Sequence, residues 1–228
     1  MDIVIDSLVI EVTRRCNMQC MHCLRGEAQN IDINKKYIDA LFDKVSNIYR
    51  ITFTGGEPTL NVDAIEYTLK KAIEKEICPS FWLATNGKVY SQRLVDVLLD
   101  YYAYCLDFGC GSEEICGLAV SLDKFHDEIS RKNLYKYKGL AFYDDSKEFK
   151  DESKRTLVNE GLAKINKIGV RNITPSEFYT EITDNTLYIE EFYLNAKGEI
   201  LVDCDLSYET QDKCSYGNIL NFDFMMAA

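Results

Sequence analysis

The chain has 228 residues, and its 37 acidic side chains outnumber its 26 basic ones to give a net charge of -11. This length is sufficient for one large domain with a core of its own. Because the acidic excess repels phosphate backbones and anionic lipid surfaces, we expect neither a nucleic-acid partner nor a membrane partner.

The first residues and the cysteine content predict a cytoplasmic protein. Residues 1–10, MDIVIDSLVI, carry no basic leader before the apolar residues and no small-residue cleavage site, so no signal peptide is predicted. No apolar run approaches the length of a transmembrane helix. In the cytoplasm, nine cysteines favour metal ligation or free thiols over a disulfide framework.

Strands and helices are predicted to alternate along the first half of the chain. Apolar, β-rich stretches predict strands at residues 8–12, 50–54, 80–84 and 117–122. Apolar residues at helical spacing predict a helix after each of the first three strands, at residues 33–49, at 61–77 and from the N-cap Ser91 onward. This alternation predicts an α/β fold with a parallel sheet and right-handed crossovers, in which every strand-to-helix loop emerges on the same side.

The pattern is weaker in the second half of the chain. Residues 152–169 predict a helix that ends at Gly169, and residues 170–174 predict a fifth strand. Residues 186–206 predict a strand, a turn at 196–199 and a second strand, which together form a hairpin.

Three cysteines, Cys16, Cys20 and Cys23, lie in the loop after the first predicted strand. A cubane iron–sulfur cluster has four irons to ligate, so three thiolates leave one iron open, as in catalytic metal sites. A zinc site is the alternative, but it needs a fourth ligand, and His22 is badly placed to share a metal with the adjacent Cys23. A chance grouping of three free thiols is the other alternative.

The Cys-x3-Cys-x2-Cys motif, followed by Gly-Gly-Glu-Pro at residues 55–58 after the second predicted strand, resembles the radical S-adenosylmethionine (SAM) superfamily. The resemblance covers roughly residues 5–180. It implies a [4Fe-4S] cluster on Cys16, Cys20 and Cys23, with SAM on the open iron. It also implies reductive cleavage of SAM to a 5′-deoxyadenosyl radical that abstracts hydrogen from a substrate. The implied fold is a partial (β/α)6 TIM-like barrel with parallel strands.

The same resemblance assigns cofactor-binding residues, which are Gly55, Gly56, Glu57 and Pro58 for the amino group of SAM, and Asn86, Ser121 and Asp123 for its methionine and ribose ends. The glycine-rich element that the family carries in its fifth unit is not evident, so the adenine contacts stay unassigned. His126 is a candidate general acid or base because the pKa of a free histidine lies near neutrality; a loop or capping role is the alternative.

The sequence predicts a barrel domain over residues 1–183 and a short C-terminal hairpin extension over residues 184–228. The extension resembles a truncated SPASM or twitch segment, a type of extension that carries auxiliary iron–sulfur clusters. The candidate ligands of a second cluster are Cys105, Cys110, Cys116, Cys204 and Cys214. The alternative is that these residues and Cys78 are free or core thiols.

The sequence thus predicts a radical SAM enzyme whose substrate is a peptide, as in the modification of ribosomally made peptides. A small metabolite or a nucleotide base is the alternative substrate, and a non-catalytic iron–sulfur or zinc protein is the alternative from another class. The expected partners are a reducing electron donor such as flavodoxin or ferredoxin, and a second copy of the chain or a partner protein that covers the barrel mouth.

Overall fold

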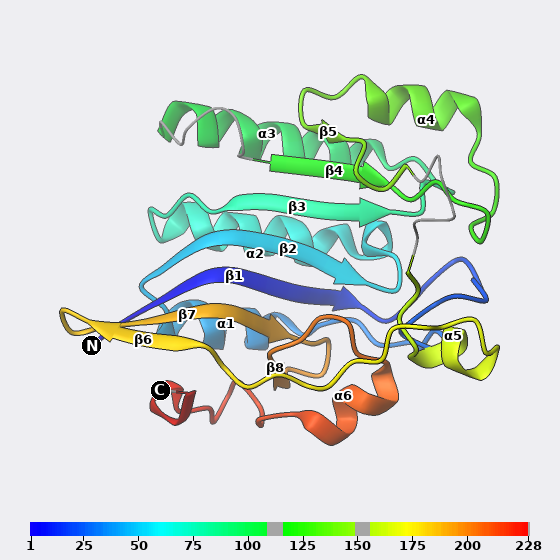
Figure 1. Cartoon of the computed structure of the whole chain (residues 1–228). Coiled ribbons are helices and arrows are strands. Elements are labelled where there is room, and N and C mark those ends of the chain that lie inside the picture. Colours follow the sequence, from blue (N-terminus) through cyan, green and yellow to red (C-terminus); the bar gives the residue numbers. More distant parts are fainter. Residues whose placement is uncertain (109–115, 149–155, 228) are drawn as a thin grey trace.

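An eight-stranded sheet runs through the computed structural model, which describes residues 1–108, 116–148 and 156–227 (Figure 1). Its strand order is β5-β4-β3-β2-β1-β7-β6, and β8 pairs with β7. The strands are β1 (Asp2–Thr13), β2 (Asn47–Gly55), β3 (Ser80–Thr85), β4 (Cys116–Val120), β5 (Tyr143–Asp144), β6 (Thr180–Thr183), β7 (Thr186–Leu194) and β8 (Ile200–Leu201). All neighbours from β5 to β7 are parallel, whereas β6 and β8 run antiparallel to β7.

The order of this sheet confirms the predicted α/β fold with a partial TIM-like barrel. Six parallel strands follow one another, as six β/α units require. Within the described part of the chain β5 and β6 do not pair with each other, so the sheet stays open.

Helices α1 to α5 lie in the connections between the parallel strands, and α1, α2 and α3 lie against one face of the sheet (Figure 1). Their bounds are α1 (Lys35–Lys44), α2 (Val62–Glu74), α3 (Gln92–Phe108), α4 (Arg131–Lys138), α5 (Gly161–Ile165) and α6 (Tyr208–Cys214), with 3-10 turns η1 (Pro58–Asn61) and η3 (Phe224–Ala227). Ser91 caps α3 as predicted, because its Oγ accepts a hydrogen bond from the N–H of Leu94 at 3.2 Å. Each helix in the described ranges is too short or too polar to cross a bilayer.

Most of the apolar positions that predicted the helices form the core. In α1 these positions are Ile38, Leu41 and Phe42, all buried against the sheet. Ile48 is also buried, but α1 ends at Lys44 and Ile48 belongs to β2, so the predicted helix over residues 33–49 is too long. The apolar spacing that predicted the helix over residues 61–77 includes Ile73, which is 40% exposed in α2 and so does not belong to the buried face.

The second half of the chain differs more from the prediction. The predicted strand at residues 170–174 is wrong, and the fifth parallel strand is instead β5, which contains only two residues. The predicted helix over residues 152–169 begins outside the described residues, and its described part, residues 156–169, is helical only over α5. The apolar residues Leu157 and Val158 contributed to the prediction of a helix. In the structure, the N–H groups of Val170 and Arg171 instead donate to the carbonyl oxygen of Leu157.

The predicted hairpin is present as β7 and β8, and it is joined to the main sheet. Strand β7 pairs with β1 in parallel from Thr186 to Leu194. Phe222 and Phe224, from the last described residues, pack in the same hydrophobic cluster as the β1 side chains. The domain boundary between residues 183 and 184 stays a prediction. Strand β7, which follows it, belongs to the same sheet as the strands before it, because it pairs with β1.

Candidate active site

The cysteine loop, residues 14–33, leaves the C-terminal end of β1 and returns to it. Its two ends are joined by backbone hydrogen bonds from Arg14 N to Ile31 O at 2.8 Å and from Ile33 N to Val12 O at 3.1 Å. The Thr13 hydroxyl donates to Asp32 Oδ1 at 2.6 Å. A loop that is closed in this way holds its interior residues near the sheet end, which is where parallel α/β proteins place their chemistry.

Cys16, Cys20 and Cys23 line one cavity of about 450 Å³ at this end of the sheet. Gly56 of the next strand-to-helix loop and Tyr208 of α6 form other parts of its wall. Among the described lining residues there is no fourth cysteine and no histidine. The structure therefore brings the three predicted thiols together, as their shared loop predicts.

The spacing of the three sulfurs fits a cluster better than a single zinc ion. Within the described ranges, His22, Asp123 and His126 form a group whose candidate metal-ligand atoms all lie within 4.8 Å of one another. The three thiols do not form such a group. Sulfurs bound to one zinc at about 2.3 Å would lie roughly 4 Å apart. A cubane cluster, with its irons at separate corners, spans a wider set of thiolates.

The electrostatics of the cavity also favour a cationic occupant. Burial raises the pKa of Cys20 to about 12, and the nearby thiols of Cys23 and Cys16 add to this shift. Burial is likewise the main cause that raises the pKa of Cys16. Three adjacent thiolates are thus unfavourable by themselves, and bound iron would offset their mutual repulsion. The residues present fit a [4Fe-4S] cluster.

A larger recess, of about 840 Å³, lies away from the thiols. It is lined by Trp82 and Gly117 in neighbouring strands, by Asp144 of β5 and by charged residues around them. None of the three described cysteines of the loop lines this recess. This recess is larger than the cysteine cavity, but the candidate cluster ligands line the smaller cavity.

Gly55 and Gly56 allow the second loop to lie directly against the cysteine loop. A Cβ atom on Gly55, whose φ is +149°, would lie 2.1 Å from the carbonyl oxygen of Thr13, and one on Gly56 would lie 2.3 Å from that of Arg15. The N–H groups of Gly56 and Glu57 donate to these same two carbonyl oxygens at 2.9 and 2.8 Å. Any larger residue would separate the two loops.

Glu57 is 2% exposed and acts as a link between the loops. Its Oε1 accepts from the hydroxyls of Thr59 and Thr85, both at 2.7 Å, and its Oε2 accepts from the N–H of Asn86 at 2.8 Å. Burial raises its pKa, and these hydrogen bonds oppose the shift. The carboxylate therefore fixes the end of β3 beside Pro58 and the glycines.

Asn86 continues this link to the cysteine loop. Its Nδ2 donates to Asn17 Oδ1 at 2.8 Å, so the residue after Cys16 is fixed from the third loop. Ser121, just beyond β4, donates its N–H to Thr85 O at 2.9 Å. The predicted SAM-binding residues thus lie on adjacent strand ends around the cysteine loop.

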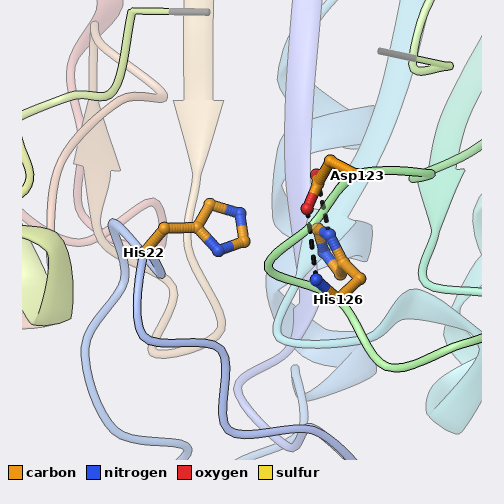
Figure 2. Close-up of side chains that lie close together, drawn as sticks. All are labelled: His22, Asp123 and His126. Carbon is orange, nitrogen blue, oxygen red and sulfur yellow. Dashed lines mark hydrogen bonds and ion pairs between the residues drawn. The ribbon is translucent and has the colours of Figure 1, made fainter. Parts of the chain in front are cut away.

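Asp123 and His126 form a bonded pair in the loop after β4 (Figure 2). Asp123 Oδ2 and His126 Nδ1 are 2.8 Å apart, and Asp123 Oδ1 accepts from the N–H groups of Phe125 and His126. His22, from the cysteine loop, points toward this pair in Figure 2. Its ring stacks on Phe125 with centroids 4.7 Å apart and meets His126 edge-on at 4.9 Å.

The contact of His22 with the fourth loop was not predicted from the sequence. From the sequence, His22 is a candidate only as a zinc ligand beside Cys23, and no local signal pairs it with residues a hundred positions away. The pairing of Asp123 with His126 was detectable, because an aspartate followed by a histidine three residues later is in reach within one turn.

The remaining described cysteines lie near strands toward opposite edges of the sheet. Cys105 of α3 and Cys116 of β4 lie together, and the hydrogen bond between the two thiols, followed by burial, raises the pKa of Cys105. Cys204 and Cys214 lie beyond β8 and at the end of α6. Strands β3, β2 and β1 separate β4 from β7, so the structure does not bring these two pairs to one place. Cys110 lies outside the described residues.

A buried polar network beneath the cysteine loop was also not predicted. Glu11 and Arg14 are both fully buried, with Oε1 and Nε 2.7 Å apart. Tyr193 donates to Glu11 Oε2 at 2.6 Å, and Arg14 Nη2 donates to Gln211 Oε1 at 2.7 Å. Charged residues inside an apolar strand such as LVIEV were the available signal, because a charge at such a position is buried only with partners.

Comparison with known proteins connects this site to a family. The sequence profile of the radical SAM superfamily matches residues 10–140. An uncharacterized protein of Methanocaldococcus jannaschii, MJ0907, is 41% identical over 63 residues, which is 26% of this chain and 22% of that protein. A probable GTP 3′,8-cyclase of Methanococcus aeolicus is 33% identical over 113 residues, which is 45% of this chain and 38% of that protein. The matches thus span well under half the length of these curated relatives.

Two solved structures share the fold. BtrN in complex with AdoMet and 2-DOIA superposes with a TM-score of 0.61 and 18% identity, over 100% of this chain and 83% of that chain. Native anSMEcpe with bound AdoMet and Cp18Cys peptide superposes with a TM-score of 0.58 and 15% identity, over 98% of this chain and 80% of that chain. At these identities the similarity concerns the fold.

Proposed function

Since the chain belongs to the radical SAM superfamily of enzymes, which use a [4Fe-4S] cluster and SAM, we propose that Cys16, Cys20 and Cys23 hold this cluster in the chain. The observation that carries the proposal is the convergence of these three thiols on one cavity without a fourth cysteine among its described lining residues. When bound, the cluster supplies the electron that cleaves SAM to a 5′-deoxyadenosyl radical, which then abstracts hydrogen from the substrate.

The protein's own residues position the cofactor and exclude water. We assign the amino group of SAM to the backbone of residues 55–58, since both oxygens of the Glu57 side chain already accept protein hydrogen bonds. Asn86, Ser121 and Asp123 keep their predicted roles at the methionine and ribose ends, Asp123 through its backbone, because both of its carboxylate oxygens also have protein partners. This arrangement is supported by their location on adjacent strand ends next to the cysteine loop.

His126 is the proposed proton donor or acceptor for the substrate. Asp123 engages its Nδ1, which orients the ring and leaves Nε2 for proton exchange. The same pairing would also serve a purely structural turn. Substitution of His126 by Asn distinguishes the two roles, because a proton-transfer role predicts a changed pH profile of turnover and a structural role predicts lowered stability alone.

The proposed substrate is a peptide. Strand β6 is the last strand of the sheet on its side and pairs with β7 alone in the described structure. Its outer edge, at the end of the sheet opposite the cysteine loop, offers backbone groups to a leader segment of the peptide added as a strand. The peptide named with the anSMEcpe structure supports this choice, because a protein of similar fold binds a peptide there. A flavodoxin or ferredoxin is the proposed electron donor, and a lid from a second copy or a partner stays a prediction.

A nucleotide or another small metabolite is the second candidate substrate. The similarity to a probable GTP 3′,8-cyclase over 113 residues favours it. Thermal-shift assays separate the two candidates: a library of extended peptides should raise the melting temperature of the reconstituted protein, whereas GTP and guanine should not. Stabilisation by GTP alone would favour the second candidate.

The central test is reductive SAM cleavage by the anaerobically reconstituted chain. With dithionite and SAM, wild-type protein carrying about four irons should release 5′-deoxyadenosine. Cys20→Ala should lose both the cluster and this activity, while the matched control Cys78→Ala, whose thiol lies outside the cavity, should keep both. Wild-type iron content in Cys20→Ala would contradict the ligand assignment. A loaded protein that never yields 5′-deoxyadenosine would be a non-catalytic iron–sulfur protein.

A further inference from the structure

The hydroxyl of Tyr208 is buried without a hydrogen-bond partner in the described structure. The residue is 3% exposed. Native proteins satisfy the large majority of such groups, and an exception commonly indicates a bound group that the polypeptide alone does not supply. Tyr208 lines the same cavity as Cys16, Cys20 and Cys23.

Several contacts fix the Tyr208 ring in this position. The Tyr208 N–H donates to the carbonyl oxygen of Arg25 at 3.0 Å, two residues beyond Cys23. The guanidinium of Arg14 lies over the ring, 4.4 Å from its centroid. Tyr208 is therefore held by two residues of the cysteine loop, its backbone by Arg25 and its ring by Arg14. Its hydroxyl has little freedom to find another partner.

We propose that the Tyr208 hydroxyl donates a hydrogen bond to the Cys23 side of the bound cluster, either to the Cys23 thiolate or to the sulfide next to it. This inference rests on the cluster assignment proposed above. A tyrosine hydroxyl can donate one hydrogen bond, and an anionic sulfur is an acceptor for it. Other residues lining this side carry their own partners: the Arg25 guanidinium donates to Leu206 O at 2.8 Å.

This hydrogen bond would give the C-terminal segment control over electron transfer. Hydrogen bonds to the sulfurs of a cluster are among the factors that set its reduction potential. A donor stabilises the reduced cluster more than the oxidised one, because the reduced cluster carries more negative charge. Tyr208 is thus a positioning and tuning residue that raises the potential of the cluster toward that of the electron donor.

The test is an anaerobic redox titration of the full chain, followed by electron paramagnetic resonance. Tyr208→Phe should keep the iron content of the wild type, while its ratio of reduced to oxidised cluster at a fixed potential should fall about tenfold, which corresponds to ~59 mV for one electron. The matched control is Tyr216→Phe, since Tyr216 is 44% exposed and its hydroxyl donates to Ser176 O at 3.4 Å. That control should titrate like the wild type. An unchanged midpoint in Tyr208→Phe would overturn the inference.

A second measurement uses the metal-free protein. Removing a buried hydroxyl that has no partner should raise the melting temperature of metal-free Tyr208→Phe by about 2–4 °C, and loading the cluster should abolish this advantage. A metal-free variant that melts at or below the wild-type temperature would refute the claim that the hydroxyl lacks a partner. If wild-type protein itself fails to bind iron through Cys20, the proposed function fails and this inference with it. A loaded wild type with an unshifted Tyr208→Phe midpoint refutes the inference alone.

Discussion

Glu11→Gln tests whether the buried network supports the cysteine loop. Glu11 Oε1 accepts from Arg14 Nε at 2.7 Å and from Ala196 N at 3.1 Å, and Oε2 accepts from the Tyr193 hydroxyl at 2.6 Å and Gln211 Nε2 at 3.2 Å. All four are donors, so whichever oxygen becomes an amide nitrogen will face two of them. The substitution also leaves the guanidinium of Arg14 without its close counter-charge.

The expected cost follows from the burial of this pair. Breaking a buried ion pair by neutralising one partner costs about 3–5 kcal/mol, and the total stability of a domain is about 5–15 kcal/mol. Asp212 Oδ1 remains 3.7 Å from Arg14 Nη1, which favours the lower end of that range. At roughly 2–4 °C per kcal/mol for a chain of this size, a loss near 3 kcal/mol lowers the melting temperature by about 6–12 °C.

The assay is urea unfolding of metal-free protein followed by circular dichroism, so that cluster loss does not contribute. Glu66→Gln is the matched control, because its carboxylate pairs with Lys70 and Arg93 at the surface and such pairs contribute little. The double variant Glu11→Met with Arg14→Met should be more stable than Glu11→Gln, since it removes both charges together. A Glu11→Gln cost below about 1 kcal/mol, or a double variant less stable than the single one, would refute this reasoning.

Three further predictions concern other parts of the chain. Glu57→Gln should cost about 1–3 kcal/mol in thermal unfolding, because an amide cannot accept every hydrogen bond that Thr85, Asn86 and their neighbours donate; a cost under about 0.5 kcal/mol would contradict this. Tyr67→Phe should destabilise the protein at pH 7 but not near pH 2, since the hydrogen bond from Tyr67 is the main cause that lowers the pKa of Asp39, and the resulting stability is present above about pH 4 and lost as the pH falls through the folded-state pKa. A pH-independent effect would exclude that linkage. Cys105→Ala should leave the iron content of the reconstituted protein at the wild-type level, because Cys105 lies near β4 and far from the cysteine loop; iron loss would instead indicate a second cluster.

Local features of the sequence predicted the local features of the site. Cys16, Cys20 and Cys23 share one loop, so their convergence required only that the loop close, which the bonds between Arg14 and Ile31 achieve. The helical caps were equally local, and Ser91 is in the predicted place. The first three predicted helices, which have a strong periodic signal, are therefore present in the structure as α1, α2 and α3, although α1 ends five residues before its predicted end.

Features that depend on distant contacts could not be predicted in this way. Strand β5 contains two residues, and a pair such as Tyr143–Asp144 carries no periodicity to detect. The parallel pairing of β7 with β1 joins segments more than 180 positions apart, for example Asp2 with Thr186. For the same reason Tyr208 gave no sequence signal at the cluster cavity, since its place there depends on how the last part of the chain packs.

The distance in sequence between Glu11 and Gln211 has a consequence for biosynthesis. A ribosome releases the cysteine loop early, but Tyr193 and Gln211, which complete the support beneath it, emerge some 180 to 200 residues later. Until then the Glu11 and Arg14 charges lack the partners that make their burial favourable. In the nascent chain the cluster site would therefore be incompletely folded, and we expect iron to be inserted after translation is complete.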